Sequence, residues 1–227
     1  MALYKSDGTQ IALVQGNEGI NLLDGKRWLP IGDSITAGGS YRNMIGNLYG
    51  LTQIYNCHGD GWQVGYGSGA AYCVLEKLAN FGAGNPDIIT IALGTNDGSA
   101  PIGTINDDPA TQTADSYTFM GCYKKLIEEL YAKYGRKTMV LLTPFQRNGG
   151  GLEARVEAIK EIGRYYSIPV CDVYSCGGAP IGTLSDTGPG DYYYTTDGLH
   201  LNDAAAAVIA PKIKNAMMAA VERFAIT

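Results

Sequence analysis

The sequence is poor in charged residues and has no long apolar run, and these shortages exclude several classes of protein. Charged side chains make up 17% of the 227 residues, and the formal net charge is −5. Nucleic acid and anionic membranes both select for clustered lysine and arginine, so neither is expected as a partner. The longest apolar run, residues 204–210, stops at Pro211, far short of the ~20 residues that span a bilayer. With 45% hydrophobic residues, the chain can instead bury a globular core.

Cysteine is scarce, and its spacing suggests no paired function. The five cysteines are odd in number and lack the CxxC spacing of a zinc site, so we predict mostly buried free thiols in a reducing compartment. Cys171 and Cys176 are close enough in sequence that a disulfide between them is an alternative. The N-terminus lacks the features of a secretory signal, which favours the cytoplasm; a chain trimmed of its leader would look the same and be secreted. The five are Cys57, Cys73, Cys122, Cys171 and Cys176.

The first 25 residues differ from the rest of the chain. Residues 2–5 and 10–14 are short apolar segments that flank Ser6-Asp7-Gly8-Thr9, and Asp-Gly between such segments is typical of a β-hairpin. Residues 17–25 are rich in Gly, Asn and Asp, which indicates a turn or linker. We interpret residues 1–25 as an appendage, either docked on the main domain or left from a junction in a longer protein. Residues 26–227 then form one domain.

From residue 26 onward, short apolar segments alternate with segments of helical periodicity. This alternation predicts an α/β fold with three layers, α/β/α, around a central, mostly parallel five-stranded sheet. Residues 98–116 have no periodicity; they are either a ligand-binding loop at the carboxyl edge of the sheet or a flexible insertion. The predicted strands are residues 28–31, 53–55, 87–93, 138–142 and 168–173, and the predicted helices are 41–49, 117–134, 152–166 and 203–224, the last with a break or kink at Pro211.

Two short motifs carry candidate catalytic side chains. His58 and His200 are the two histidines, and His200 ends Asp197-Gly198-Leu199-His200. A carboxylate three residues before a histidine can accept its Nδ1 proton and fix the tautomer. Gly32-Asp33-Ser34-Ile35-Thr36 follows a predicted strand and precedes a helix, so Ser34 is expected at the carboxyl edge of the sheet. Taken singly, each motif is equally typical of a solvated turn or a helix cap.

Two further segments follow predicted strands at the same edge. Gly94-Thr95-Asn96-Asp97 follows the strongest strand; its Asn96 amide could face a developing oxyanion, or the segment could form an ordinary Asx turn. Residues 56–61, with the sequence Asn-Cys-His-Gly-Asp-Gly, end a shorter strand. A glycine there could offer its backbone N–H to the same oxyanion.

Together these four segments resemble the blocks of the GDSL/SGNH hydrolase family, in the family's order, over residues 26–227. The resemblance implies a flavodoxin-like SGNH hydrolase fold. It also implies a catalytic triad in which Ser34 is the nucleophile, His200 the base and Asp197 the acid. No cofactor and no metal are required by such a site.

The resemblance also implies an oxyanion hole, made of the N–H groups of Ser34 and Gly61 and the side chain of Asn96. Gly61 lies five residues after the asparagine of its block and matches best, while Gly59 is the competing position. Asp33 and Asp97 are not triad members in this interpretation. We expect both to be structural and to accept hydrogen bonds from turn amides.

The expected activity is hydrolysis of a carboxylic ester by a serine esterase through an acyl-enzyme. Tyrosines outnumber phenylalanines 16 to 4, and Trp62, Tyr66 and residues 192–194 lie in or near the motifs. Amphipathic aromatics suit a sugar-like ligand better than a fatty acyl chain, or else they simply pack a surface. We therefore expect deacetylation of an acylated carbohydrate, with a small-molecule or saccharide ester as the partner.

Three alternatives stay open. Within the same family, the protein could be a lipase, thioesterase or lysophospholipase, which should have a longer apolar groove. From another class, it could be a non-catalytic binding or structural module, attached through residues 1–25 to a larger surface-recognition protein. The third alternative is metal-assisted hydrolysis, with ligands drawn from His58, Asp60, Asp97, Asp197 and His200.

Overall fold

The computed structural model describes residues 21–82, 84–179, 181 and 193–225, together with the backbone of two short N-terminal strands. These strands, β1 (Leu3–Tyr4) and β2 (Gln10–Ile11), pair antiparallel, so the predicted hairpin pairing is confirmed. The division of the chain at residue 25 stays a prediction. Leu23, on the N-terminal side of that division, is fully buried in the apolar core.

The centre of the molecule is a five-stranded parallel sheet, which confirms the predicted three-layer α/β fold. The strand order is β4-β3-β5-β6-β7, and every pairing is parallel. All five residues of β5 and of β6 are buried, because strands covered on both faces need apolar side chains on both faces. The strands are β3 (Arg27–Gly32), β4 (Thr52–Gln53), β5 (Ile88–Ala92), β6 (Thr138–Leu142) and β7 (Val170–Cys171).

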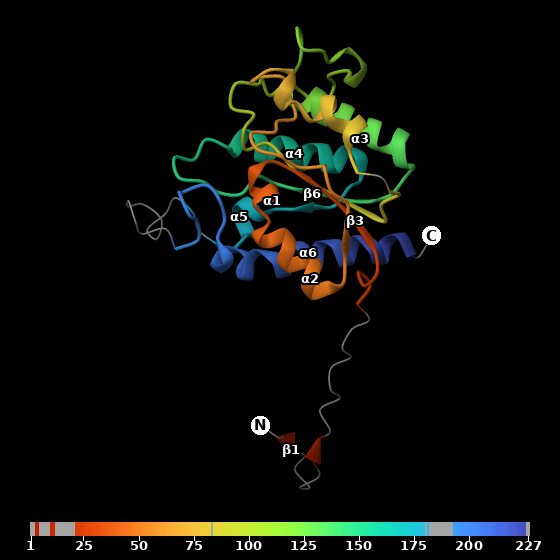
Figure 1. Cartoon of the computed structure of the whole chain (residues 1–227), viewed down its shortest axis with the longest axis vertical. Helices are drawn as coiled ribbons and strands as arrows, with labels where there is room; N and C mark the ends of the chain where they lie inside the picture. The colour runs from red at the N-terminus through yellow and green to blue at the C-terminus, as the bar shows by residue number, and fades with distance from the viewer. Residues whose placement is uncertain are drawn as a thin grey trace.

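Helices cover both faces of this sheet (Figure 1). α2 (Ser40–Tyr49) and α6 (Asp203–Ala225) lie on one face, and α3 (Phe119–Tyr134) and α4 (Glu153–Tyr166) lie on the other. Each helix turns an apolar stripe toward the strands, so the core divides into two clusters, one on each face. The shorter elements are α1 (Ser34–Gly38), α5 (Val173–Cys176) and the 3₁₀ helices η1 (Ala70–Tyr72), η2 (Val74–Asn80) and η3 (Pro109–Thr111).

The edge strands and the last helix differ in detail from the prediction. β7 is shorter than residues 168–173 because Asp172 caps α5, its side chain accepting a hydrogen bond from the Ser175 N–H. β4 begins one residue earlier than predicted and ends two residues earlier, at Gln53. The predicted break at Pro211 does not occur, since α6 runs through this exposed proline without interruption.

By length and composition alone, α6 could cross a membrane over residues 203–223. Its buried residues, among them Ile209, Ile213 and Met217, pack in the core cluster that α2 shares. A buried core helix passes the same test of length and hydropathy, so no membrane span is shown.

The long segment 98–116 is tied to α3, which argues against a flexible insertion. The Lys124 ammonium donates to the backbone carbonyls of Ile105 and Asp107, at 2.8 Å each. The Asp107 carboxylate accepts hydrogen bonds from the Thr118 hydroxyl at 2.6 Å and from Thr104. These contacts fix the segment although it contains little regular structure.

All five cysteines are free thiols, as predicted. Cys57, Cys73 and Cys122 are buried, whereas Cys171 is partly buried and Cys176 is exposed. The alternative of a disulfide between Cys171 and Cys176 is wrong, since both are free.

Candidate active site

The candidate site lies where the strand order of the sheet reverses. β3 lies between β4 and β5. The chain leaves β3 through α1 and α2 on one face, and it leaves β5 towards α3 on the other face. Connections that diverge in this way open a crevice at the carboxyl ends of the two strands, which is where doubly wound sheets bind ligands. Ser34 lies two residues after the end of β3, and Asn96 lies four residues after the end of β5.

A tight turn presents Ser34 at the end of β3. Asp33 is the N-cap of α1, and its Oδ1 accepts a hydrogen bond of 2.9 Å from the Ile35 N–H. Gly32 is required because a Cβ there would lie 2.0 Å from the Thr36 hydroxyl oxygen. Burial raises the pKa of Asp33 to about 6, against the lowering effect of the Ile35 and Thr95 hydrogen bonds. The predicted structural role of Asp33 is thereby confirmed.

A short hairpin presents Asp197 and His200. Thr195 pairs antiparallel with Leu201, and the Thr196 N–H donates to the His200 carbonyl at 2.9 Å. Asn202 fixes the base of this hairpin: its Nδ2 donates to the backbone carbonyls of residues 193 and 195. Its Oδ1 accepts from the Ala205 N–H in the first turn of α6. One side chain thus joins the hairpin to the start of a core helix.

The three side chains form a continuous hydrogen-bonded chain. His200 Nδ1 lies 2.6 Å from Asp197 Oδ2, and His200 Nε2 lies 2.9 Å from Ser34 Oγ. An ionised carboxylate can only accept, so the proton sits on Nδ1 and Nε2 is left to accept from the serine hydroxyl. Burial tends to raise the pKa of Asp197, but hydrogen bonds from the His200 backbone and ring and from the Leu199 N–H together lower it.

The second block distinguishes its two glycines. The Gly59 N–H donates to the Gly32 carbonyl at 3.2 Å and is therefore committed to the backbone. Gly61 is in the left-handed region, with φ +69°. Within the part of the chain that the structure describes, neither the Gly61 N–H nor the Ser34 N–H has a hydrogen-bond acceptor. Gly61 rather than Gly59 is thus free to bind an oxyanion.

Asn96 lies beside Gly61, and the two line the same cavity. One N–H of the Asn96 amide donates to the Trp62 carbonyl at 3.2 Å, which fixes the amide and leaves its second hydrogen available. The neighbouring Asp97 is fully buried, and its carboxylate accepts from the Val64 and Gly65 N–H groups. Burial raises the pKa of Asp97 to about 6. Asp97 therefore has the structural role that the sequence predicted.

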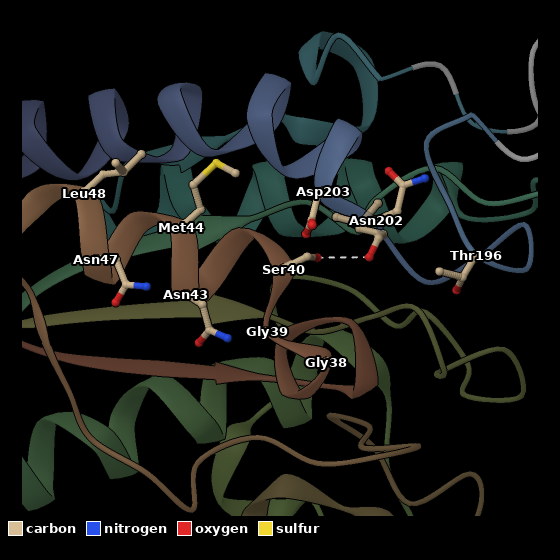
Figure 2. Close-up of a pocket in the computed structure, with 11 residues that line it drawn as sticks. Gly38, Gly39, Ser40, Asn43, Met44, Asn47, Leu48, Thr196, Asn202 and Asp203 are labelled. Atoms are coloured by element: carbon tan, nitrogen blue, oxygen red, sulfur yellow. Dashed lines mark hydrogen bonds between the residues drawn. The ribbon is translucent and has the colours of Figure 1, made fainter.

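Two cavities lie next to these residues. The larger is an open groove of about 740 Å³ that runs from the α1–α2 junction to the start of α6 (Figure 2). Thr196 and Leu201, which flank the Asp197–His200 turn, line it together with the α2 side chains Asn43, Met44, Asn47 and Leu48. The smaller cavity, of about 370 Å³, is lined by Gly61, Gln63, Ser68, Tyr72 and Asn96. No residue of segment 98–116 lines either cavity.

The aromatic residues singled out in the sequence mostly pack the core, which corrects their interpretation as ligand contacts. Trp62 stacks on Phe81, with ring centroids 6.2 Å apart. Tyr66 is 8% exposed and donates its hydroxyl to Glu76. Tyr193 is exposed and Tyr194 is packed against the core, while residue 192 lies outside the described residues. Tyr72, which the sequence did not single out, lines the smaller of these two cavities.

The alternative metal site is not assembled. Among the described residues, no group of three or more His, Cys, Asp and Glu side chains could hold a metal ion. Asp97 is bound to backbone amides and Asp197 to His200. His58 Nε2 is buried without a partner, and burial, followed by the charge of Arg42, lowers the pKa of His58 to about 4. His58 is therefore neutral near pH 7, and its lowered pKa makes it a weak base.

Comparison with known proteins supplies independent information. The sequence matches the model of the GDSL-like lipase/acylhydrolase family over residues 31–208. No curated protein matches the chain. A solved structure of a Lactobacillus plantarum protein is similar with a TM-score of 0.70 at 21% identity, over 86% of this chain and 98% of the other. A possible lipase from Chitinophaga pinensis has a TM-score of 0.64 at 23% identity, over 86% and 98%.

A variant of a Geobacillus acetyl-xylooligosaccharide esterase is also similar, with a TM-score of 0.58 at 18% identity, over 86% of this chain and 94% of that one. At identities of this size, the structural likeness shows the fold alone.

Proposed function

The chain belongs to the GDSL-like lipase/acylhydrolase family, and we propose that it is a serine esterase that hydrolyses a carboxylic ester through a triad of Ser34, His200 and Asp197. Membership of this family supports a hydrolase that acts on esters. The observation that carries the serine mechanism is the position of the His200 ring, 2.9 Å from Ser34 Oγ and 2.6 Å from Asp197 Oδ2. Side chains at these distances can pass a proton without rearrangement.

The reaction proceeds in two halves. Ser34 Oγ attacks the ester carbonyl carbon while His200 Nε2 takes the hydroxyl proton, and the tetrahedral intermediate collapses as that proton passes to the leaving alcohol. The acyl group is then bound to Ser34. Water attacks the acyl carbon with His200 again as base, and the carboxylic acid leaves as Ser34 regains its proton. Asp197 orients the imidazole and stabilises its charged form throughout.

The negative charge that develops on the carbonyl oxygen is held by three donors: the N–H groups of Ser34 and Gly61 and the amide of Asn96. This assignment is supported by the free backbone N–H groups of Ser34 and Gly61 and by the fixed amide of Asn96. Such donors act in advance of the reaction and need no reorganisation. The mechanism involves no cofactor.

For the substrate, we propose an acetyl or similarly short acyl ester of a carbohydrate. The leaving alcohol must receive its proton from His200. We therefore assign the alcohol to the larger groove, because Thr196 and Leu201, which flank the Asp197–His200 turn, line that groove. Asn43 and Asn47 line the same groove, and side-chain amides are suitable partners for sugar hydroxyls. One protein of similar fold is an acetyl-xylooligosaccharide esterase. A lipase, thioesterase or lysophospholipase remains the alternative, supported by Met44 and Leu48 in the same groove.

The test is hydrolysis of p-nitrophenyl acetate by the wild type and by Ser34→Ala at equal enzyme concentration. We expect wild-type turnover and a decrease in kcat of ~10⁶-fold, to background, in the variant. Thermal unfolding of both proteins checks that the variant is folded. Equal rates would reject Ser34 as the nucleophile and favour the non-catalytic binding module. Acetylated and fatty-acylated substrates, compared next, separate the carbohydrate esterase from the lipase.

A further inference from the structure

The cavity beside Gly61 is built by one rigid segment, residues 61–73. Its two ends meet at a parallel bridge between Gln63 and Cys73, where the Gln63 N–H donates to the Tyr72 carbonyl at 2.9 Å. The Val64 N–H, at the turn into the segment, is held by the Asp97 carboxylate. The segment is therefore anchored both to itself and to the end of β5.

Gln63 joins this segment to the proposed oxyanion residue Asn96. The side chain is buried, at 3% exposure. Its Nε2 donates to the Asn96 backbone carbonyl at 2.6 Å and to the Ser68 hydroxyl at 2.7 Å, and its Oε1 accepts from the Ser68 N–H at 3.0 Å. The cavity walls thus keep a fixed position relative to Asn96.

Tyr72 is the bulky side chain of this cavity. It ends η1 and is 45% exposed, so its ring faces the solvent side of the pocket. The ring packs against Gly61, because a Cβ placed on that glycine would lie 3.0 Å from Tyr72 Cδ1 and 3.2 Å from Cε1. A substrate group that extends from a carbonyl bound at Gly61 into this cavity meets the Tyr72 ring.

Proton transfer decides which part of an ester enters this cavity. The leaving alcohol must stay close to His200 Nε2, which protonates it. The cavity is lined by Gly61 and Asn96 but by neither Ser34 nor a residue of the Asp197–His200 turn. A group bound in this cavity thus contacts the proposed oxyanion residues and no residue of the Asp197–His200 turn, which suits the acyl part of the ester and not the leaving alcohol.

We propose that this cavity is the acyl-binding pocket and that Tyr72 is the specificity residue that limits it to short acyl groups. The proposal rests on the serine esterase function proposed above. Gln63 is a positioning residue that holds the pocket wall against Asn96. The class of substrate is an ester with an acyl chain of two to about four carbons, because the Tyr72 ring obstructs a longer chain.

The experiment measures kcat/KM for p-nitrophenyl acetate, butyrate and octanoate, which share one leaving group and differ in the acyl chain alone. Wild type should prefer acetate. Tyr72→Ala should raise the ratio of kcat/KM for octanoate to kcat/KM for acetate by at least ~10-fold, because room for one more methylene in a pocket changes kcat/KM by about this factor. Tyr72→Phe keeps the ring and should retain the wild-type ratio.

Tyr165→Ala is the matched control. Tyr165 is similarly exposed, at 59%, but lies near the end of α4, which leads to the start of β7 at the opposite edge of the sheet. Its ratio should equal that of wild type. The same variants are then assayed with acetate esters of three different alcohols, and thermal unfolding shows that each is folded.

An active Tyr72→Ala with an unchanged acyl ratio overturns the proposal, and so does a change of preference among the alcohols alone. Neither of these results bears on the esterase itself. If the wild type and Ser34→Ala hydrolyse all esters at the same rate, the proposed function fails, and this inference fails with it for that separate reason.

Discussion

Replacing Asp33 by Asn should make the protein's stability less sensitive to pH. The Asp33 carboxyl is 2% exposed, and its pKa is raised from 3.8 to about 6. A group whose pKa is higher in the folded state stabilises the fold at pH values below its unfolded pKa, and this contribution is lost as the pH rises through the folded pKa. Ionisation of Asp33 therefore costs stability between pH 4 and 6.

The size of this effect follows from the pKa shift. Each pKa unit corresponds to 1.36 kcal/mol, so a shift from 3.8 to about 6 gives a change of about 2.5 kcal/mol between pH 4 and pH 7. Asparagine carries no titratable proton. Its Oδ1 can still accept the Ile35 N–H, and its Nδ2 can donate to the Thr95 hydroxyl, so the cap of α1 is retained.

The assay is urea unfolding of wild type and Asp33→Asn at several pH values from 4 to 7. The difference in unfolding free energy, variant minus wild type, should rise by about 2.5 kcal/mol over this range. Asp97, whose pKa is also about 6, and His58, whose pKa is lowered to about 4, are present in both proteins, so their own titrations contribute to both curves. The difference keeps the repulsion between Asp33 and Asp97, which is a smaller cause of the Asp33 shift than burial. A difference that stays constant with pH would refute the reasoning that burial of Asp33 disfavours its charge.

Two other predictions concern residues that support the triad. Asn96→Ala should lower kcat for p-nitrophenyl acetate by ~10²–10³ with little change in KM, because an oxyanion donor acts in the transition state; a change in KM alone would contradict this role. Asn202→Ala should cost about 1–2 kcal/mol in urea unfolding and also reduce kcat, because its side chain joins the hairpin of His200 to α6. Asn202→Asp keeps the cap of α6 but loses the Nδ2 donor, so it should recover the stability and not the activity; recovery of both would show that the hairpin does not depend on the donor.

The central layers could be predicted because the strands there have both faces buried. β5 and β6 are continuous apolar segments bounded by turn residues, and this pattern predicts buried strands from the sequence alone. The edge strands β4 and β7 are two residues long, and only partly buried. Their ends depend on local competition, such as the Asp172 side chain that caps α5, which periodicity does not describe.

The candidate triad could be located because each member lies in a local turn with its own signature. Gly32-Asp33-Ser34 and Asp197-x-x-His200 are short motifs whose geometry is set by hydrogen bonds within a few residues. The choice between Gly59 and Gly61 could not be made in this way. It depends on the Gly59 N–H donating to Gly32, a contact between two different strand ends.

The aromatic residues that line the cavities could not be predicted, because a side chain's burial in the fold, and not its residue type, decides whether it can contact a ligand. The sequence suggested Trp62 and Tyr66 as ligand contacts, but Trp62 stacks on Phe81 and Tyr66 is buried in the core. Tyr72 follows a run of small residues without periodicity. Its place in the cavity is set by the pairing of residues 63 and 73, which no local pattern reveals.

The hydrogen bond between Ser34 and His200 joins residues that are 166 positions apart in the sequence. During synthesis, the segment that carries Ser34 leaves the ribosome early, while His200 and α6 emerge among the last residues of this chain. The proposed nucleophile is thus made long before its proposed base, and the hairpin that carries His200 is joined to α6 through the Asn202 side chain. If the proposed triad is correct, activity therefore requires the completed fold, and a single proteolytic cut that removes the segment with His200 and α6 would abolish it.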